Sequence, residues 1–204
     1  MNVNRNRAER GEITRESLVA AARLLFGRDG FTATSLDDIV AAAGVTKGAL
    51  YHHFENKDDL FRAVAEAVKR DINTRLSDLF LGSDSFSALE AGCFTILEAY
   101  LDPAVRQIVW TDAPAVLSLS AYREIQGRYE QVFLRASLRR AMREGIIESL
   151  PLRPLTAVLT GAIGEGCTFI AASPNPVSAR EEVGRTMSRL LQGLRRSPTP
   201  DSSQ

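Results

Sequence analysis

The stretch from Ser35 to Phe54, which reads SLDDIVAAAGVTKGALYHHF, constrains the fold more than any other part of the chain. Ser35 can cap a short helix, and Asp38 follows at the acidic position of a capping box. Gly44 tolerates the left-handed backbone that ends many helices. Thr46 can then cap a second short helix. Two short helices joined by a tight turn that contains Gly predict a helix-turn-helix, in which the second helix enters the major groove of DNA.

The alternative interpretation of this stretch is an ordinary helical corner inside a core. A corner of that kind would carry more aliphatic residues on its second helix, where only Leu50 is expected to face inward. The other side chains of that helix are polar or small: Thr46, Lys47, Gly48, Ala49, Tyr51 and His52. The small Gly48–Ala49 pair leaves a flat surface that suits van der Waals contact with a base, which favours the nucleic-acid interpretation.

The segment TKGALYHHFENKDDL, from Thr46 to Leu60, resembles the signature of the tetracycline-repressor (TetR) family of transcriptional regulators. The resemblance covers residues 12–71, and the rest of the chain matches only in its all-helical pattern. It implies that matched positions contact DNA, with Lys57 meeting a phosphate and with Leu50 and Phe54 in the core. The DNA-binding residues that the resemblance implies are Thr34, Ser35, Thr46, Lys47, Gly48, Ala49, Tyr51, His52 and Lys57.

Charge alone does not predict a nucleic-acid-binding protein. The chain has 25 basic and 25 acidic residues, and residues 1–60 hold eight basic and nine acidic side chains. A DNA-facing surface must therefore come from local placement of the basic residues. Several acids stand at expected helix starts, where the helix dipole favours them.

Helical periodicity predicts an all-α fold of about nine helices. We expect a flexible basic arm at residues 1–12 in which Arg5 and Arg7 can contact DNA, a helix-turn-helix domain at 13–60, a ligand-binding and dimerisation domain at 61–196, and a disordered tail at 197–204. A long helix from Asn56 to about residue 80 has no Gly or Pro to interrupt it. A short helix is expected from Pro103 to Trp110, followed by a loop or a distorted turn over 111–115, which contains Asp112 and Pro114.

The second domain carries two further expectations. A pocket for a small lipophilic or aromatic effector is predicted from its aromatic residues and from two acids, Glu165 and Asp112. The residues expected to line it are Phe94, Leu97, Tyr100, Trp110, Phe133, Glu165 and Phe169. Two copies of the chain are expected to pair through the last two helices, at Gly161, Gly164, Val183, Met187, Leu190 and Leu194. The apolar stretch 155–172 is interrupted by Gly and Glu165, so we interpret it as a core or interface helix and expect no membrane association.

Nothing in the sequence indicates a catalytic site, a metal site or a cofactor. Cys93 and Cys167 are far apart and stand among apolar neighbours, which is typical of buried thiols. No secretory leader is recognised, so a cytoplasmic protein is expected.

The sequence therefore predicts a homodimeric, DNA-binding transcriptional regulator, a repressor that a small molecule releases from a palindromic operator. Two alternatives stay open: a regulator that needs no effector, and a helical enzyme or small-molecule carrier. Binding to promoter DNA would distinguish either regulator from the enzyme or carrier. A ligand cavity would distinguish the repressor released by a small molecule from the regulator that needs no effector.

Overall fold

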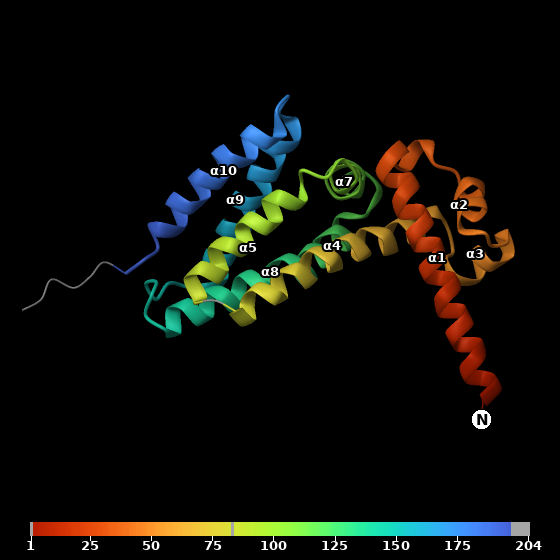
Figure 1. Cartoon of the computed structure of the whole chain (residues 1–204), viewed down its shortest axis with the longest axis horizontal. Coiled ribbons are helices and arrows are strands. Elements are labelled where there is room, and N and C mark those ends of the chain that lie inside the picture. The colour runs from red at the N-terminus through yellow and green to blue at the C-terminus, as the bar shows by residue number, and fades with distance from the viewer. Residues whose placement is uncertain (1, 83, 197–204) are drawn as a thin grey trace, which may run out of the picture. The chain divides into compact units, whose positions relative to one another are not determined.

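The computed structural model describes the backbone of residues 2–82 and 84–196, and the side chains of 9–79, 84–129 and 131–196. The fold is all-α, as predicted (Figure 1). Within the described residues, β pairing is limited to one isolated antiparallel bridge between Ile147 and Arg195. The elements, in order, are α1 Asn2–Ala33, α2 Leu36–Ala43, α3 Lys47–His53, α4 Lys57–Gly82, α5 Ser85–Ala99, α6 Pro103–Val105, the π-helix η1 Arg106–Asp112, α7 Ala113–Val116, α8 Leu119–Arg143, α9 Leu152–Ala172 and α10 Pro176–Gln192.

The chain divides into two compact units, and their limits differ from the predicted domains. The first unit comprises the residues up to 71 together with 102–125, and the second comprises 72–101 with 126–204. The predicted boundary at residue 60 separates α6, η1 and α7 from the N-terminal helices. In the structure α6 and η1 pack on α1, and α7 packs on η1. A Cβ added to Gly27 would lie 2.6 Å from the Ala104 Cβ, so the close approach of α6 needs the glycine.

The core of the first unit is aromatic. The Phe26 ring lies 5.3 Å from Phe61 and 5.6 Å from Phe31, measured between ring centroids. Leu18 and Phe26 of α1 are fully buried in this core. Leu50 of α3 and Leu60 of α4 are buried in the same way. This core fixes the three short elements α2, α3 and the start of α4 around α1.

Helix α1 is longer than the sequence analysis indicated. It runs from Asn2 to Ala33, so the expected flexible arm at residues 2–12 is helical instead. The segment has no proline, and its single glycine, Gly11, lowers helix stability by only about 1 kcal/mol relative to alanine. Near the other end, Gly30 has φ 81°, and this left-handed residue kinks the helix before α2.

The second unit is built on close helix contacts at glycines. A Cβ at Gly92 of α5 would lie 2.1 Å from Phe133 of α8, and one at Gly166 of α9 would lie 2.7 Å from Val183 of α10. These glycines therefore let whole helices approach and bury the side chains opposite them. Cys93 and Cys167 are buried here as free thiols, as expected.

The segment after α5 corrects a second prediction. Residues 111–115 are not a loop, because η1 continues to Asp112 and α7 follows directly. Pro114 stands in the first turn of α7, where no backbone donor is required.

Helix α9 is long and apolar enough to cross a membrane by length and composition alone. Core helices satisfy the same criterion, and Leu159, Ile163 and Ile170 of α9 are buried within the unit. The helix packs on both α5 and α10.

Candidate nucleic-acid interface

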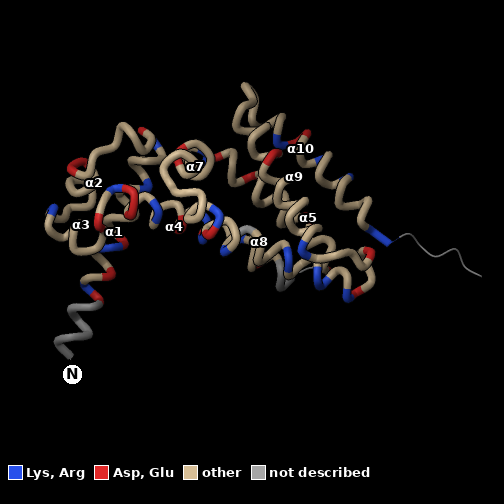
Figure 2. Tube along the Cα trace, turned by 180° about the vertical axis from the view of Figure 1, so that it is seen from behind, with Lys and Arg blue, Asp and Glu red and all other residues tan. Residues whose placement is uncertain are grey.

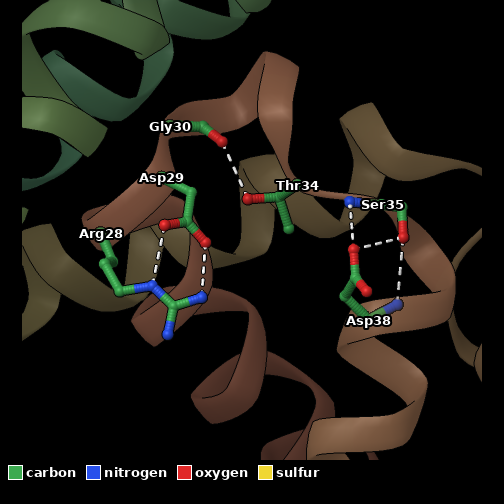
Figure 3. Close-up of polar contacts among 6 residues, drawn as sticks. All are labelled: Arg28, Asp29, Gly30, Thr34, Ser35 and Asp38. Carbon is green, nitrogen blue, oxygen red and sulfur yellow. Dashed lines mark hydrogen bonds and ion pairs between the residues drawn. The ribbon is translucent and has the colours of Figure 1, made fainter.

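Helix α2 begins at a complete capping box, as the sequence predicted. The Ser35 Oγ accepts a hydrogen bond from the Asp38 N–H at 3.1 Å, and the Asp38 Oδ2 accepts from the Ser35 N–H at 3.2 Å (Figure 3). The Ser35 hydroxyl also donates to Oδ2 at 2.6 Å, which lowers the pKa of Asp38. The box satisfies orphan donors of the first turn and fixes where α2 starts.

The turn and the start of α3 also follow the sequence. Gly44 has φ 66° and donates its N–H to the last carbonyls of α2. The Thr46 Oγ1 then accepts from the Ala49 N–H at 3.2 Å and caps α3. Leu50 is fully buried and Phe54 nearly so, so α3 is anchored on one side only.

The other side of α3 faces solvent. Thr46, Lys47, Gly48 and His52 are exposed, and Ala49 is half-buried. Tyr51 is 52% exposed although it is a large aromatic residue. An anchored helix with exposed polar groups, small residues and one aromatic ring can lie against base edges in a major groove.

The charge on this surface is shared between α2 and α3. The Lys47 Nζ lies 2.7 Å from the Asp37 Oδ1, and the hydrogen bond to this carboxylate raises the pKa of Lys47. Acidic and basic positions are interspersed along the described helices of the first unit (Figure 2). In this structure the positive charge of Lys47 on the exposed side of α3 is therefore paired with the Asp37 carboxylate of α2.

Thr34 does not lie on the exposed surface. Its side chain is buried, and its Oγ1 donates to the Gly30 carbonyl at 2.8 Å (Figure 3). The hydroxyl therefore holds the connection between α1 and α2 and is not presented to solvent. Ser35, the next residue, is exposed.

Lys57 lies at the start of α4 and is half-buried. Its Nζ stands 4.2 Å from the centroid of the Phe31 ring, and burial lowers the pKa of the ammonium group. The helix start is set by Asn56, whose Oδ1 accepts from the Asp59 N–H at 2.9 Å, as expected. Of the proposed arm, Arg5 and Arg7 belong to helical backbone, but their side chains lie outside the described residues.

Sequence reasoning missed how the end of α1 is held. The Asp112 carboxylate accepts from the Phe31 N–H at 2.8 Å and from the Gln107 Nε2 at 3.1 Å. A Cβ at Gly30 would lie 3.1 Å from the same Gln107 atom. The pair Gly27 and Gly30 was the available signal, because glycines one turn apart permit another backbone to approach.

The predicted ligand-pocket residues are distributed over both units. Trp110 belongs to the first unit and the other six to the second. Leu97 and Tyr100 are buried, and Phe133 packs into the space at Gly92. Phe169 is instead 55% exposed on α9, and Glu165 beside it is exposed.

Glu165 and Phe169 line an open groove between α9 and α10 together with predicted dimer residues. The groove has a volume of about 440 Å³, and its lining includes Val183, Met187 and Leu190. Gly161 is exposed on the same helix, and added Cβ atoms at Gly161 and Gly164 would meet nothing within 4 Å. Leu194 lies beyond the end of α10 and is half-buried.

No metal or thiol chemistry is indicated. Within the part of the chain that the structure describes, no group of three or more His, Cys, Asp or Glu side chains could hold a metal ion. Burial raises the pKa of the Cys93 thiol to about 12, so the reactive thiolate is scarce at neutral pH.

Known proteins resemble both parts of this chain. Residues 18–64 match the family of bacterial regulatory proteins described as the tetR family, and residues 86–194 match the tetracyclin repressor-like C-terminal domain. The Transposon Tn10 TetC protein of Escherichia coli is 38% identical over 102 residues, which is 50% of each chain. The HTH-type transcriptional repressor BepR of Brucella suis is 32% identical over 112 residues, or 53% of each chain.

The chain thus spans about half the length of these curated relatives. A longer match is found with a TetR-family transcriptional regulator from Pectobacterium atrosepticum, whose crystal structure is known. It is 29% identical, with a TM-score of 0.80 over 94% of this chain and 98% of that one. The C-terminal domain match alone covers more than half of the residues, and with the helix-turn-helix match it shows that the chain belongs to the TetR family.

Proposed function

We propose that this chain is a sequence-specific DNA-binding transcriptional repressor that acts in the cytoplasm as a homodimer and is released from a palindromic operator by a small molecule. The observation that carries the proposal is α3, a helix capped by Thr46 and anchored by buried Leu50, with Lys47, Tyr51 and His52 on its exposed side. BepR, to which the chain is similar, is described as a transcriptional repressor. A regulator of this kind performs no catalysis.

The pairing of two copies is supported by the exposed apolar residues of α9 and α10. Val158 of α9 is 68% exposed and Leu190 of α10 is 51% exposed, and Phe169 is exposed on α9 as well. Contiguous apolar surface of this kind is typical of an interaction site. A two-fold pairing would present two α3 helices to two half-sites, and a palindromic operator has the same symmetry.

Release by an effector is proposed to act through the segment from Pro103 to Val116. This segment packs on α1 at Gly27, and Asp112 holds the Phe31 N–H just before α2 begins. A π-helix, here η1, is often found at functional positions. A ligand that repacks η1 would therefore move the end of α1, and with it the helix-turn-helix. We expect the effector to be lipophilic or aromatic.

The DNA-binding proposal is tested on a duplex selected from a random-sequence library with the purified full chain. Affinity is then measured by gel shift for Lys47→Ala, Tyr51→Ala and Lys57→Ala. Each lost base contact should weaken binding by about 1–3 kcal/mol. Lys57→Ala should lower the slope of log affinity against log salt by about one per half-site.

Arg153→Ala is the matched control, because Arg153 is exposed at the start of α9 in the second unit. Its affinity and salt slope should equal those of the wild type. Selection of no preferred duplex, or unchanged affinity in all three α3 and α4 variants, would contradict the proposal.

The release proposal is tested separately. A library of aromatic compounds is screened by thermal shift, and the concentration of a hit that releases half of the duplex is compared for wild type and Trp110→Ala. Coupling between two sites is usually about 1–3 kcal/mol, so we expect a shift of about fivefold or more. Equal concentrations for the two proteins would exclude Trp110 from the release path.

A further inference from the structure

A second groove in the second unit, between α5 and α10, has no role in the functions proposed so far. Its volume is about 470 Å³, and it is lined by Phe94, Arg180, Glu181, Arg185, Ser188 and Arg189. The lining residues of α10 recur at helical spacing, while Ala179, Met187 and Leu191 of the same helix are buried. The groove therefore lies along the outward-facing side of α10, and the opposite side of this helix is buried in the unit.

The floor of the groove is an aromatic ring held in place by a glycine. A Cβ at Gly184 would lie 2.4 Å from the Phe94 Cε1, so the ring packs directly on the backbone of α10. The Arg180 guanidinium carbon lies 5.4 Å from the centroid of the same ring. Phe94 is only half-buried, which leaves part of its ring for another molecule.

One hydrogen-bond donor of the Arg180 guanidinium group has no acceptor in the part of the chain that the structure describes. Its Nη2 donates to the Glu98 Oε2 at 3.2 Å, but its Nε is buried and has no hydrogen-bond partner among the described residues. A buried polar group without a partner is costly, so an additional acceptor would be favourable there.

The two outer arginines of the groove are uncommitted. Arg185 and Arg189 are exposed, and neither forms an ion pair with any residue that the structure describes. Glu181 is the one acidic residue of the lining, against three arginines. The Ser188 hydroxyl donates to the Glu90 Oε1 at 2.6 Å, so the nearby carboxylate of Glu90 is already engaged.

We propose that this groove binds a small organic anion that carries an aromatic ring. Arginine presents a planar set of donors that matches a carboxylate or a phosphate, and it also stacks on aromatic rings. Arg185 and Arg189 would hold the anionic group, while the ring would lie against Phe94 and the Arg180 guanidinium. A groove of this volume falls in the range that accommodates small molecules.

The probe for this site is 2-naphthoate, titrated into the full-length protein without DNA and followed by calorimetry. 2-Naphthamide is the neutral control, and acetate is the control for a carboxylate without a ring. We expect the naphthoate to bind more tightly than either. Arg185→Gln and Arg189→Gln should each weaken it about tenfold or more, since a hydrogen bond to a charged group is lost.

Arg135→Gln is the matched variant, because Arg135 is an exposed arginine of α8 in the same unit. Naphthoate binding should be unchanged in it. Equal binding to the wild type and to the Arg185→Gln, Arg189→Gln double variant would overturn the proposal. The proposal would also be overturned if the double variant lost self-association in sedimentation but kept naphthoate binding. In that case the two arginines would serve the pairing of two copies.

The DNA proposal is independent of this outcome. The double variant is also measured by gel shift on the selected duplex. Lost naphthoate binding with retained duplex affinity supports the anion site and leaves α3 as the DNA-contacting helix. If the protein binds naphthoate tightly but selects no preferred duplex, the result supports the anion site and contradicts the DNA-binding proposal.

Discussion

The chain contains two helix pairs that expose very different surfaces, α2 with α3 and α9 with α10. The first pair is short, begins at side-chain caps, and exposes polar groups around Tyr51. The second pair is long, packs through glycine contacts, and exposes apolar side chains such as Phe169 and Leu190. A short helix pair with capped ends holds a few polar side chains in defined positions, whereas a long apolar helix pair offers a large apolar surface for burial.

This difference has an energetic reason. Hydrogen bonds and charges give specificity over few atoms, while burial of apolar surface contributes in proportion to area, at about 25 cal/mol per Å². The first pair is therefore suited to contact with base edges, and the second to pairing with another copy. The following changes test this division, from the largest expected effect to the smallest.

Charges on the α9–α10 surface should have the largest effect. Phe169→Glu with Leu190→Glu would bury two unpaired charges in the proposed contact between copies, so we expect the dissociation constant of the dimer to rise at least about a hundredfold. Both side chains are exposed in a single copy, and its folding should be unaffected. Sedimentation velocity over a concentration series measures the change.

Leu24→Glu is the control for the double variant, because Leu24 is 75% exposed on α1. It should leave self-association unchanged. A double variant that sediments like the wild type would show that the apolar side of α9 and α10 is not where two copies meet.

Alanine at two glycines should separate close packing from open surface within the second unit. Gly92→Ala places a Cβ against Phe133, and overpacking of this kind should lower the free energy of unfolding by about 1–3 kcal/mol. Gly164→Ala meets no neighbouring atom and should raise it by up to about 1 kcal/mol through higher helix propensity.

Urea unfolding of both variants at one protein concentration measures these values, since self-association contributes to the apparent stability. Equal effects of the two substitutions would mean that the helix contact at Gly92 is looser than described. A loss of dimer in Gly164→Ala would instead assign that position to the contact between copies.

The α2 cap should respond to pH in a defined direction. Ser35→Ala removes the cap and should lower the free energy of unfolding by about 1 kcal/mol at pH 7. The Ser35 hydrogen bonds lower the pKa of Asp38 in the folded state. The resulting stabilisation is present above the usual aspartate pKa of about 4, and it is lost as the pH falls through the lower, folded value.

The difference between Ser35→Ala and the wild type should therefore shrink on acidification, and the Asp38 carboxyl pKa measured by NMR should rise in the variant. Thr32→Ala, an exposed hydroxyl deletion at the end of α1, is the matched control and should change neither quantity. If the difference in unfolding free energy between Ser35→Ala and the wild type did not change with pH, the effect of the cap would not depend on the titration of Asp38.

The smallest effect is expected from Asp37→Asn. It breaks the ion pair with Lys47, which is exposed to solvent and therefore contributes little to folding. Removal of the acid frees Lys47 for a phosphate, so affinity for the selected duplex should rise a few-fold in fluorescence anisotropy. Asp78→Asn changes net charge equally at an exposed position of the second unit and should have no effect.

The sequence was most informative where the signals are local. Ser35 and Asp38, Gly44, and Thr46 each act within a few residues, so the caps and turn of the helix-turn-helix could be predicted almost residue by residue. Thr34 was included among the DNA-binding residues through the family resemblance. Its burial could not be predicted locally, because it depends on the Gly30 carbonyl that the hydroxyl meets after α1 kinks.

The sequence was least informative where partners are distant along the chain. Asp112 and Pro114 read as a loop, yet Asp112 meets Phe31, which is 81 residues away. Periodicity alone also cannot tell which side of an apolar helix is covered. For that reason Phe169 was assigned to an internal pocket, although it is exposed on α9.

The bond between Asp112 and Phe31 also bears on how such regulators can be recombined. The unit that contains the helix-turn-helix is not one continuous segment of the chain, because part of its packing is supplied by residues 102–125. A chimera that joins residues 1–71 to a foreign C-terminal half would leave Gly27 without Ala104 and Phe31 without its acceptor. A chimera is therefore expected to keep the packing of the first unit when residues 1–71 and 102–125 are transplanted together.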